Sequence, residues 1–404
     1  MESAKSNLIE ESNNKRALKV KNKALLIIGV LFIAGNLRAT VSGVAPMLGE
    51  ISNSFTLSSI EAGMLTTLPL IAFALFAPPS AYFAKRFGLE YTIFGALLLI
   101  AIGVVCRSYG LVGSLFLGTI LIGIGVSIGN VLLPIIVKRD FPMKVAVMTS
   151  SYVLAMGAAS SLTSVFSIPL AKFHQLGWQV ALSAIVILTV LAMLIWLPQL
   201  KYNSKPTVLA TDVTSTNLWA NKLAWQISIY LGFGSFFTYI IMAWLPTINV
   251  LAGYTEAEAG VIHGVFQIGT ALPGIFLIPL MAKLDDQRIP AFGICLVAGI
   301  CCVGILKLPE YSYFWSLMLG VASGAWFILG ISFISLRTSN SLQATSLSGM
   351  AQFIGYSCAA VGPMLGGYIN ELTQSWDNVM FMIAFISLFT AVIGLFVGRN
   401  QKIQ

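Results

Sequence analysis

Long apolar runs occupy most of the sequence, and they restrict the fold more than any other feature does. A helix that crosses a bilayer needs about 20 mostly apolar residues. Twelve runs meet this requirement, at 24–48, 59–83, 89–106, 112–137, 143–171, 178–198, 223–250, 256–282, 289–306, 312–335, 343–369 and 377–398. They are continuously apolar and do not alternate, which indicates helices rather than a transmembrane barrel. Because only 9% of the 404 residues are charged, we expect an all-α membrane protein with twelve transmembrane helices.

The distribution of basic residues predicts the orientation of these helices. With the N-terminus inside, 19 of the 23 Lys and Arg residues fall in cytoplasmic loops and tails, and Arg107, Lys172 and Lys307 fall outside. The positive-inside rule therefore places both termini in the cytoplasm of a multi-pass protein in the inner (plasma) membrane. Orientation accounts for the net charge of +8, so the charge does not indicate a nucleic-acid partner. Arg38 is the one cation that fits neither side.

The chain repeats itself weakly at a spacing near 198 residues. Glu61–Gly63 recurs as Glu258–Gly260, and Trp178 falls opposite Trp376. Both glutamates follow Ser or Thr by three residues, which predicts capping boxes at two helix starts. The repeat indicates two pseudo-symmetric six-helix bundles. The predicted organisation is a cytoplasmic tail at 1–23, an N-terminal bundle at 24–198, a cytoplasmic linker at 199–222, a C-terminal bundle at 223–398 and a cytoplasmic tail at 399–404.

Four stretches carry a family resemblance, in the same order along the chain. They are "NLRATVSGVAPMLGEI" (36–51), "GNVLLPIIVKRDFP" (129–142), "AWLP" (243–246) and "LSGMAQFIGYSCAAVGPMLGG" (347–367). The chain thereby resembles the cyanate/2-nitroimidazole transporter family of the major facilitator superfamily. The resemblance implies a secondary active transporter in which the bundles rock about a central site and expose it alternately to each side. One departure is Gly232–Ser235, "GFGS", where that family often has G-L-Q-S.

Two further motifs suggest gating residues. "AYFAKRFGLEY" (81–91) resembles the superfamily's cytoplasmic motif G-x-L-a-D-R-x-G-R-K, with Lys85 in place of the acid and Arg86 matching. In the superfamily this motif holds one bundle to the other through charges at helix ends. Because the charges are altered here, the alternative is that these basic residues only orient the helices by the positive-inside rule. Gly362 and Pro363 lie in "GPMLGG", where glycines permit close helix packing and proline adds a bend. We expect a packing and rocking hinge there.

Arg38 is the residue that most needs an explanation. It lies roughly 21 Å along the first helix from residue 24, too deep to reach either interface easily. A central arginine costs on the order of 3 kcal/mol on insertion scales. No Asp or Glu falls in the middle of any run, so one alternative is an arginine satisfied by carbonyls, waters and amides such as Asn36 or Asn130. The other is an arginine that faces an aqueous cavity, where its fork of donors binds an anionic or strongly dipolar substrate.

Other polar and aromatic residues in the runs complete a predicted substrate-binding site. The set is Asn36 and Arg38 on helix 1, Asn130 on helix 4, Tyr239 and Trp244 on helix 7, His263 and Gln267 on helix 8, Trp326 on helix 10, and Gln352 and Tyr356 on helix 11. Each aromatic residue taken alone has packing as its alternative. Because a histidine side chain ordinarily titrates near neutral pH, His263 is a candidate for proton coupling, with a hydrogen-bonded packing role as the alternative. A substrate that carries its own proton, or anion exchange, would need no such residue.

These features favour a secondary active transporter for a small anion or a polar nitrogen compound such as cyanate. One alternative is an exporter of drug-like heterocycles such as nitroimidazoles, and another is a non-transporting membrane sensor. Neither an H-E-x-x-H nor a Walker motif is present, and we expect no enzyme activity, no direct ATP drive, no cofactor and no metal. The expected partners are a small-molecule substrate, protons and the lipid bilayer. We expect a monomer.

Overall fold

The computed structural model describes residues 23–173, 175, 177–204, 218–281, 284, 286–339 and 341–403. Apart from Lys23, the predicted N-terminal tail lies outside these residues, as do residues 205–217 of the predicted linker. Within the described ranges the secondary structure is helical, without strands.

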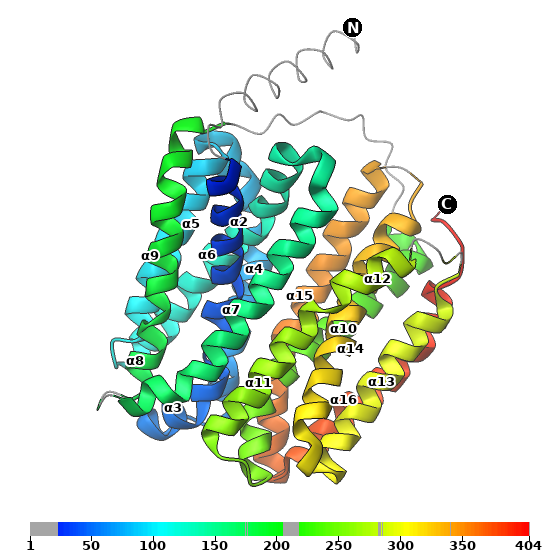
Figure 1. Cartoon of the computed structure of the whole chain (residues 1–404). Helices are drawn as coiled ribbons and strands as arrows, with labels where there is room; N and C mark the ends of the chain where they lie inside the picture. The colour runs from blue at the N-terminus through cyan, green and yellow to red at the C-terminus, as the bar shows by residue number, and fades with distance from the viewer. Residues whose placement is uncertain are drawn as a thin grey trace, which may run out of the picture.

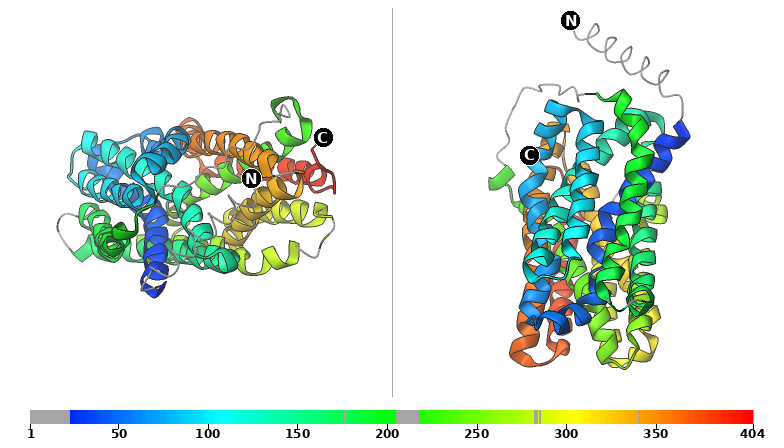
Figure 2. Two further views of the ribbon diagram at one scale, coloured as in Figure 1. Left: turned by 90° about the horizontal axis from the view of Figure 1, so that it is seen from above. Right: turned by 90° about the vertical axis from the view of Figure 1, so that its left-hand side faces the viewer.

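The first half of the chain forms one group of helices (Figure 1). Its elements are α2 (Lys23–Ser42), η1 (Ala45–Met47), α3 (Leu48–Phe55), α4 (Ser59–Phe87), α5 (Leu89–Arg107), α6 (Val112–Asp140), η2 (Pro142–Lys144), α7 (Val145–Phe173), α8 (Trp178–Ser183), α9 (Ile185–Trp196) and η3 (Leu197–Tyr202). The second half forms a second group beside it, as the view from above shows (Figure 2). Its elements are η4 (Leu218–Ala220), α10 (Lys222–Leu251), α11 (Glu256–Ala271), α12 (Pro273–Met281), α13 (Arg288–Lys307), η5 (Pro309–Tyr311), α14 (Ser312–Leu336), α15 (Ser341–Thr373) and α16 (Trp376–Val397).

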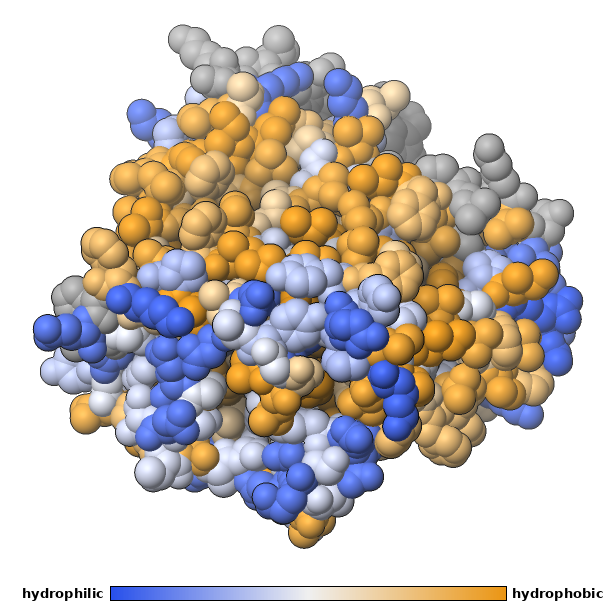
Figure 3. Space-filling view, turned by 60° about the horizontal axis from the view of Figure 1, so that its bottom comes forward, coloured by the Kyte–Doolittle hydropathy of each residue, from blue (hydrophilic) through white to orange (hydrophobic). Residues whose placement is uncertain are grey.

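The predicted all-helical membrane architecture is confirmed. In the part of the chain that the structure describes, eleven helical segments are long and apolar enough to cross a membrane. The remaining predicted run, 343–369, lies within α15, a helix of 33 residues. Apolar residues cover the flank of the molecule, and polar residues gather at the end turned toward the viewer in Figure 3. Such a flank suits lipid contact.

The first predicted run is not one continuous helix. Its helix ends at Ser42, and the chain continues through the short η1 into α3. Pro46 explains the break, because it has no N–H to donate to the Ser42 carbonyl one turn earlier. The Arg107 guanidinium donates to the Thr40 carbonyl at 2.8 Å. A cation at this position stabilises the negative end of the α2 helix dipole.

Both predicted capping boxes are present, at equivalent places in the two groups. The Glu61 carboxylate accepts from the Ser58 backbone N–H at 2.9 Å, and the Glu258 carboxylate accepts from the Thr255 backbone N–H at 2.9 Å. The side chain of each capping Ser or Thr accepts from the backbone N–H of its glutamate. The acids thus serve to start α4 and α11, as the sequence predicts.

One end of the molecule, here called the basic end, carries Lys85, Arg139, Arg337 and Ile403, the last residue that the structure describes. Each group of helices has an arginine with several partners there, half-buried in the case of Arg139 and buried in the case of Arg337. Arg139 forms salt bridges with Glu90, which is 1% exposed, at 2.9 Å and with Asp140 at 2.6 Å. Arg337 hydrogen-bonds to Gln287 and donates to the Gly398 carbonyl at 3.0 Å.

A surface ion pair lies near the second of these clusters. Asp286 pairs with Arg288 at 2.6 Å. Hydrogen bonds from the Arg288 side chain and backbone hold the pKa of Asp286 below its ordinary value. This carboxylate therefore stays charged at neutral pH.

At the opposite end, here called the far end, the two groups of helices pack closely through α4 and α15. A methyl group on Gly63 would lie 2.7 Å from the Pro363 carbonyl oxygen, so only glycine permits this approach. The Ile60 backbone N–H donates to the Glu371 carboxylate at 3.1 Å, and the Thr67 hydroxyl donates to the Ala360 carbonyl at 2.7 Å. These contacts close the far end between the two groups.

Candidate substrate cavity

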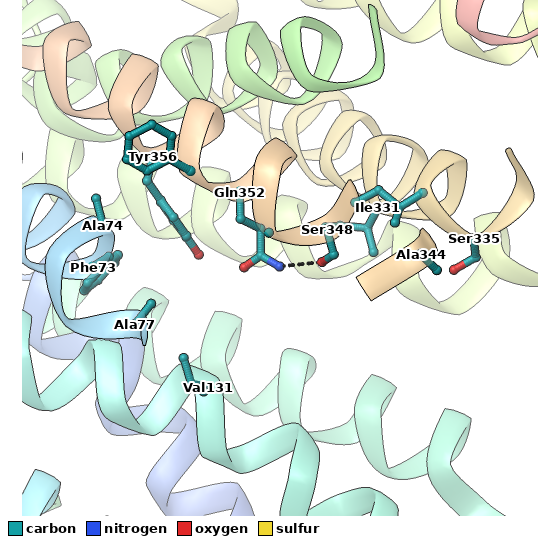
Figure 4. Close-up of a pocket in the computed structure, with 13 residues that line it drawn as sticks. Phe73, Ala74, Ala77, Val131, Ile331, Ser335, Ala344, Ser348, Gln352 and Tyr356 are labelled. Carbon is teal, nitrogen blue, oxygen red and sulfur yellow. Dashed lines mark hydrogen bonds between the residues drawn. The ribbon is translucent and has the colours of Figure 1, made fainter. Parts of the chain in front are cut away.

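A cavity of 660 Å³ lies between the two groups of helices, in the half of the molecule toward the basic end. Phe73, Ala74 and Ala77 of α4 and Val131 of α6 line one side of it. α14 and α15 line the other side, with Ser348, Gln352 and Tyr356 facing across in Figure 4. The full lining is Phe73, Ala74, Ala77, Val131, Ile331, Ile334, Ser335, Ala344, Ser348, Gly349, Gln352, Phe353 and Tyr356.

The chemistry of this lining is mostly apolar, with a few polar groups. The Gln352 amide donates to the Ser348 hydroxyl at 2.8 Å, which fixes the amide along α15 (Figure 4). Phe73 and Tyr356 meet edge to face across the cavity, with ring centroids 5.7 Å apart. An apolar pocket of several hundred Å³ with a few polar groups is typical of a small-molecule site.

Arg38 is half-buried on α2, and no described residue accepts a hydrogen bond from its side chain. Its charge interacts electrostatically with Tyr239 of α10 and with His263 of α11. Tyr239 interacts in turn with Tyr356, which lines the cavity. The predicted residues Arg38, Tyr239, His263 and Tyr356 therefore lie near one another, although they come from four different helices. The carbonyls and amides considered as partners for Arg38 do not bind it in the described part of the chain.

His263 and Gln267 lie beside this group but are completely buried. The His263 Nδ1 atom is 2.9 Å from the Ser164 hydroxyl of α7, and its Nε2 atom is 3.2 Å from the Gln267 amide nitrogen. Gly260 and Gly264 let α11 approach α7 closely: a methyl group on Gly260 would lie 2.9 Å from the Ser164 carbonyl oxygen. The pair therefore sits in the seam between the two groups of helices.

Three of the predicted site residues form hydrogen bonds within their own group of helices. The Asn36 amide donates to the Phe32 and Leu188 carbonyls at 2.8 and 3.2 Å and accepts from the Thr189 hydroxyl at 2.6 Å. The Trp244 indole donates to the Pro363 carbonyl at 2.9 Å, and the Trp326 indole donates to the Tyr230 carbonyl at 3.0 Å. All three side chains are buried. The structure thus places them in helix packing and does not bring them to the cavity lining.

Asn130 is half-buried on α6, one residue before Val131 of the cavity lining.

The four predicted gating residues lie at two different places. Lys85 and Arg86 are exposed at the basic end, and the Arg86 guanidinium lies 5.4 Å from the Phe87 ring. Gly362 and Pro363 are buried in α15, where it packs against α10 and α4.

The sequence argument did not identify Phe73, Val131 and the small residues of α4 and α15 as cavity residues. Apolar side chains in a transmembrane helix carry no local signal that separates cavity from lipid. The sequence argument also did not identify Glu90 as the buried partner of Arg139. Glu90 stands at the start of a run, where an acid is expected because it stabilises the positive end of the helix dipole.

Comparisons with known proteins agree with this architecture. Residues 27–360 match the Major Facilitator Superfamily. The 2-nitroimidazole transporter of Escherichia coli (strain K12) is 42% identical over 389 residues, which cover 96% of this chain and 99% of the relative. The cyanate transport protein CynX of the same organism is 23% identical over 380 residues, covering 92% of this chain and 95% of that protein.

Solved structures share the fold. The inward open conformation of the xylose transporter XylE from E. coli matches with a TM-score of 0.74 and 12% identity, over 91% of this chain and 95% of that one. The resemblance to the cyanate and 2-nitroimidazole transporters, and the two-bundle fold expected from it, are confirmed. The chain therefore belongs to the Major Facilitator Superfamily and is a membrane transporter of that type.

Proposed function

We propose that the protein is a secondary active transporter for a small planar nitrogen heterocycle that carries a negative or strongly dipolar group. The observation that carries this proposal is Arg38, a permanently charged guanidinium without a hydrogen-bond acceptor among the described residues. Its five N–H donors form a planar fork that suits a carboxylate, a nitro group or a similar group. The substrate would supply the acceptor that the protein lacks.

The cavity supports a heterocycle over a bare triatomic anion. Its volume of 660 Å³ and its lining by Phe73, Tyr356 and aliphatic side chains suit a flat ring. Aromatic side chains that meet a planar ligand contribute about 0.5–1.5 kcal/mol per contact beyond burial of area. The 42% identical relative, named for a 2-nitroimidazole, agrees with this substrate class.

A cyanate-like anion is the second candidate, and Arg38 favours it. Binding of a small anion depends more on attraction to a cation than on contact with aromatic side chains. α2 contains no acid that would neutralise Arg38. The more distant relative named for cyanate transport agrees with this alternative.

In either case we infer transport by alternating access. The cavity toward the basic end and the closed contacts between α4 and α15 at the far end support a state that opens to one side. The positive-inside rule makes the basic end cytoplasmic. The predicted gating roles of Lys85, Arg86, Gly362 and Pro363 belong to the same proposal.

Uptake into liposomes that contain only the purified protein tests this function. Labelled 2-nitroimidazole, cyanate and a small carboxylate are offered with and without a pH gradient. We expect the heterocycle to move, and we expect Tyr356→Leu to slow it by about threefold to tenfold, the loss that about 1 kcal/mol of aromatic contact implies. Tyr368→Leu is the matched control, because Tyr368 lies on the same helix but is 47% exposed and outside the cavity lining.

Cyanate uptake that depends on Arg38 but not on Tyr356 would favour the second candidate. A protein that moves none of the three compounds under any gradient would overturn both, as expected for a non-transporting sensor.

A further inference from the structure

His263 is the one described histidine, and it is placed where the two bundles meet. It is 0% exposed, and it contacts α7 of the first bundle from α11 of the second. A buried ring of this kind must satisfy both nitrogens inside the protein. Its partners therefore reveal where its protons are.

The hydrogen bonds are consistent with one tautomer of His263 in this state. With the Gln267 amide oriented as in this structure, its Nε2 atom donates and the His263 Nε2 atom, 3.2 Å away, accepts. The proton of the neutral ring is then on Nδ1 and is donated to the Ser164 hydroxyl at 2.9 Å. This direction is consistent, because Ser164 uses its own proton to donate to the Ser160 carbonyl at 2.9 Å.

The Gln267 amide is poised for a second arrangement. Its Oε1 atom is buried and has no hydrogen-bond partner in this state, which costs about 1–3 kcal/mol. If a proton binds to the His263 Nε2 atom, rotation of the amide brings Oε1 to accept from the new N–H. The doubly protonated ring would then donate to both Ser164 and Gln267, and the unsatisfied oxygen would gain a partner.

Arg38 opposes that protonation when no substrate is bound. Burial is the largest factor that disfavours a charge on the His263 ring, and the Arg38 charge adds to it, because two like charges near each other disfavour one another. The other elements packed against α11 are α7, α10, α12, α14 and η1, and the described parts of these elements contain no Asp or Glu. They bring the serines of α7 and Tyr239 of α10 near this group, while Lys172 and Lys222 lie at helix ends. No described acid on these elements offsets the Arg38 charge, so a bound negative or dipolar substrate would relieve this part of the opposition.

We propose that His263 and Gln267 form a proton-binding site that fills together with the substrate at Arg38, so that the protein is a proton–substrate symporter. This inference rests on the proposed function, because it needs a negative or dipolar group at Arg38. The proton comes from water, binds the Nε2 lone pair and is released unchanged on the other side. Linkage is reciprocal, so a substrate that favours protonation must itself bind more tightly when the proton is present. Cooperative binding of this kind gives symport, whereas antiport requires that the two compete.

The position in the seam provides access for the proton. Ser164 and His263 belong to different bundles, so any rocking that opens the far end separates α7 from α11 along this contact. His263 would then meet water from the far side, which is the side from which a symported proton enters.

The experiment uses the full-length protein in liposomes, with labelled 2-nitroimidazole, cyanate and a small carboxylate as substrates and a pH-sensitive dye inside. We expect substrate entry to acidify the lumen, and a gradient of one pH unit to support about tenfold accumulation for one proton per substrate. His263→Gln should lose this accumulation but keep exchange of labelled for unlabelled substrate at equal concentrations on both sides. His174→Gln, which changes the only other histidine of the sequence, is the matched control.

Substrate binding to the purified protein gives a second readout. Affinity for the substrate should rise as the pH falls in the native protein and should lose this dependence in His263→Gln. Substrate movement in the native protein without acidification, or with the same accumulation in His263→Gln, would overturn the proton site and leave the proposed function standing. If the native protein moves no substrate at all, the proposed function itself fails. The native protein's own proton movement decides the matter even if the variant does not fold.

Discussion

At the scale of single residues, hydrogen-bond partners separate side chains that look equivalent in the sequence. Asn36 and Arg38 are neighbours on α2, yet Asn36 is satisfied by α9 and its own helix, whereas Arg38 has no acceptor among the described residues. Trp326 and Tyr356 are both aromatic residues of the second bundle. Trp326 is held by the Tyr230 carbonyl, while Tyr356 lines the cavity. A polar group that is already paired is not available to a substrate.

The charge of Arg38 gives the first prediction. Arg38→Gln should lower the rate of substrate uptake at low concentration by roughly 10- to 100-fold, because a hydrogen bond to a charged group contributes about 1.5–3 kcal/mol. Arg38→Lys should keep part of the activity, since it keeps the charge but loses the planar fork. Initial uptake rates in liposomes measure both effects. Arg399→Gln, a change of an exposed arginine, should transport like the native protein. Equal uptake by native protein and Arg38→Gln would show that this charge does not bind the substrate.

At the scale of elements, the closed far end is built from helix ends and small residues. The Glu371 carboxylate of α15 accepts from the N-terminal N–H of Ile60 in α4, where the positive end of the helix dipole strengthens the contact. Beside it, the Asn370 amide donates to the Ser59 hydroxyl at 3.5 Å, and Gly63 permits the close approach to Pro363. These contacts join two helices from different bundles, so they must break if the far end opens.

A cross-link across this contact gives the second prediction. Oxidation of the double variant Ser59→Cys/Asn370→Cys should join α4 to α15 and stop net transport, and reduction should restore it. The single variants, treated with the same oxidant, are the controls and should keep transporting. Uptake before and after reduction measures the effect. A cross-linked protein that still transports would mean that the two helices need not separate.

At the scale of the whole molecule, the 198-residue repeat relates features that differ in detail. Arg139 and Arg337 occupy equivalent places at the basic end, but Arg139 pairs with the carboxylates of Glu90 and Asp140, whereas Arg337 bonds to Gln287 and to backbone carbonyls. The two bundles thus share a plan while their polar contacts have diverged. The charges of Glu90, Arg139 and Asp140 in the first bundle are paired with one another, which limits the cost of removing them from water.

The orientation of the whole molecule gives the third prediction. A fluorescent protein fused after Gln404 should fluoresce in the cytoplasm, and alkaline phosphatase at the same place should be inactive, because the basic end is expected inside. Phosphatase fused after Gln374, in the turn between α15 and α16, should be active. Phosphatase activity of these two fusions in intact cells is the measurement. The opposite pattern would reverse the sidedness of the cavity.

The sequence by itself determined the helical membrane fold, the apolar segments that cross the membrane and the two capping boxes, because apolar length and Ser/Thr-x-x-Glu spacing act locally. It also singled out Arg38, because a basic residue in an apolar run without an acid can be recognised from the sequence whatever the arrangement of the helices. Only the tertiary structure decided which side chains of different helices meet: Phe73 with Tyr356, Ser164 with His263, and Trp326 with Tyr230. The physical reason is that a helix in lipid can be apolar on every face, so hydropathy does not record which face turns toward a neighbour, toward lipid or toward the cavity.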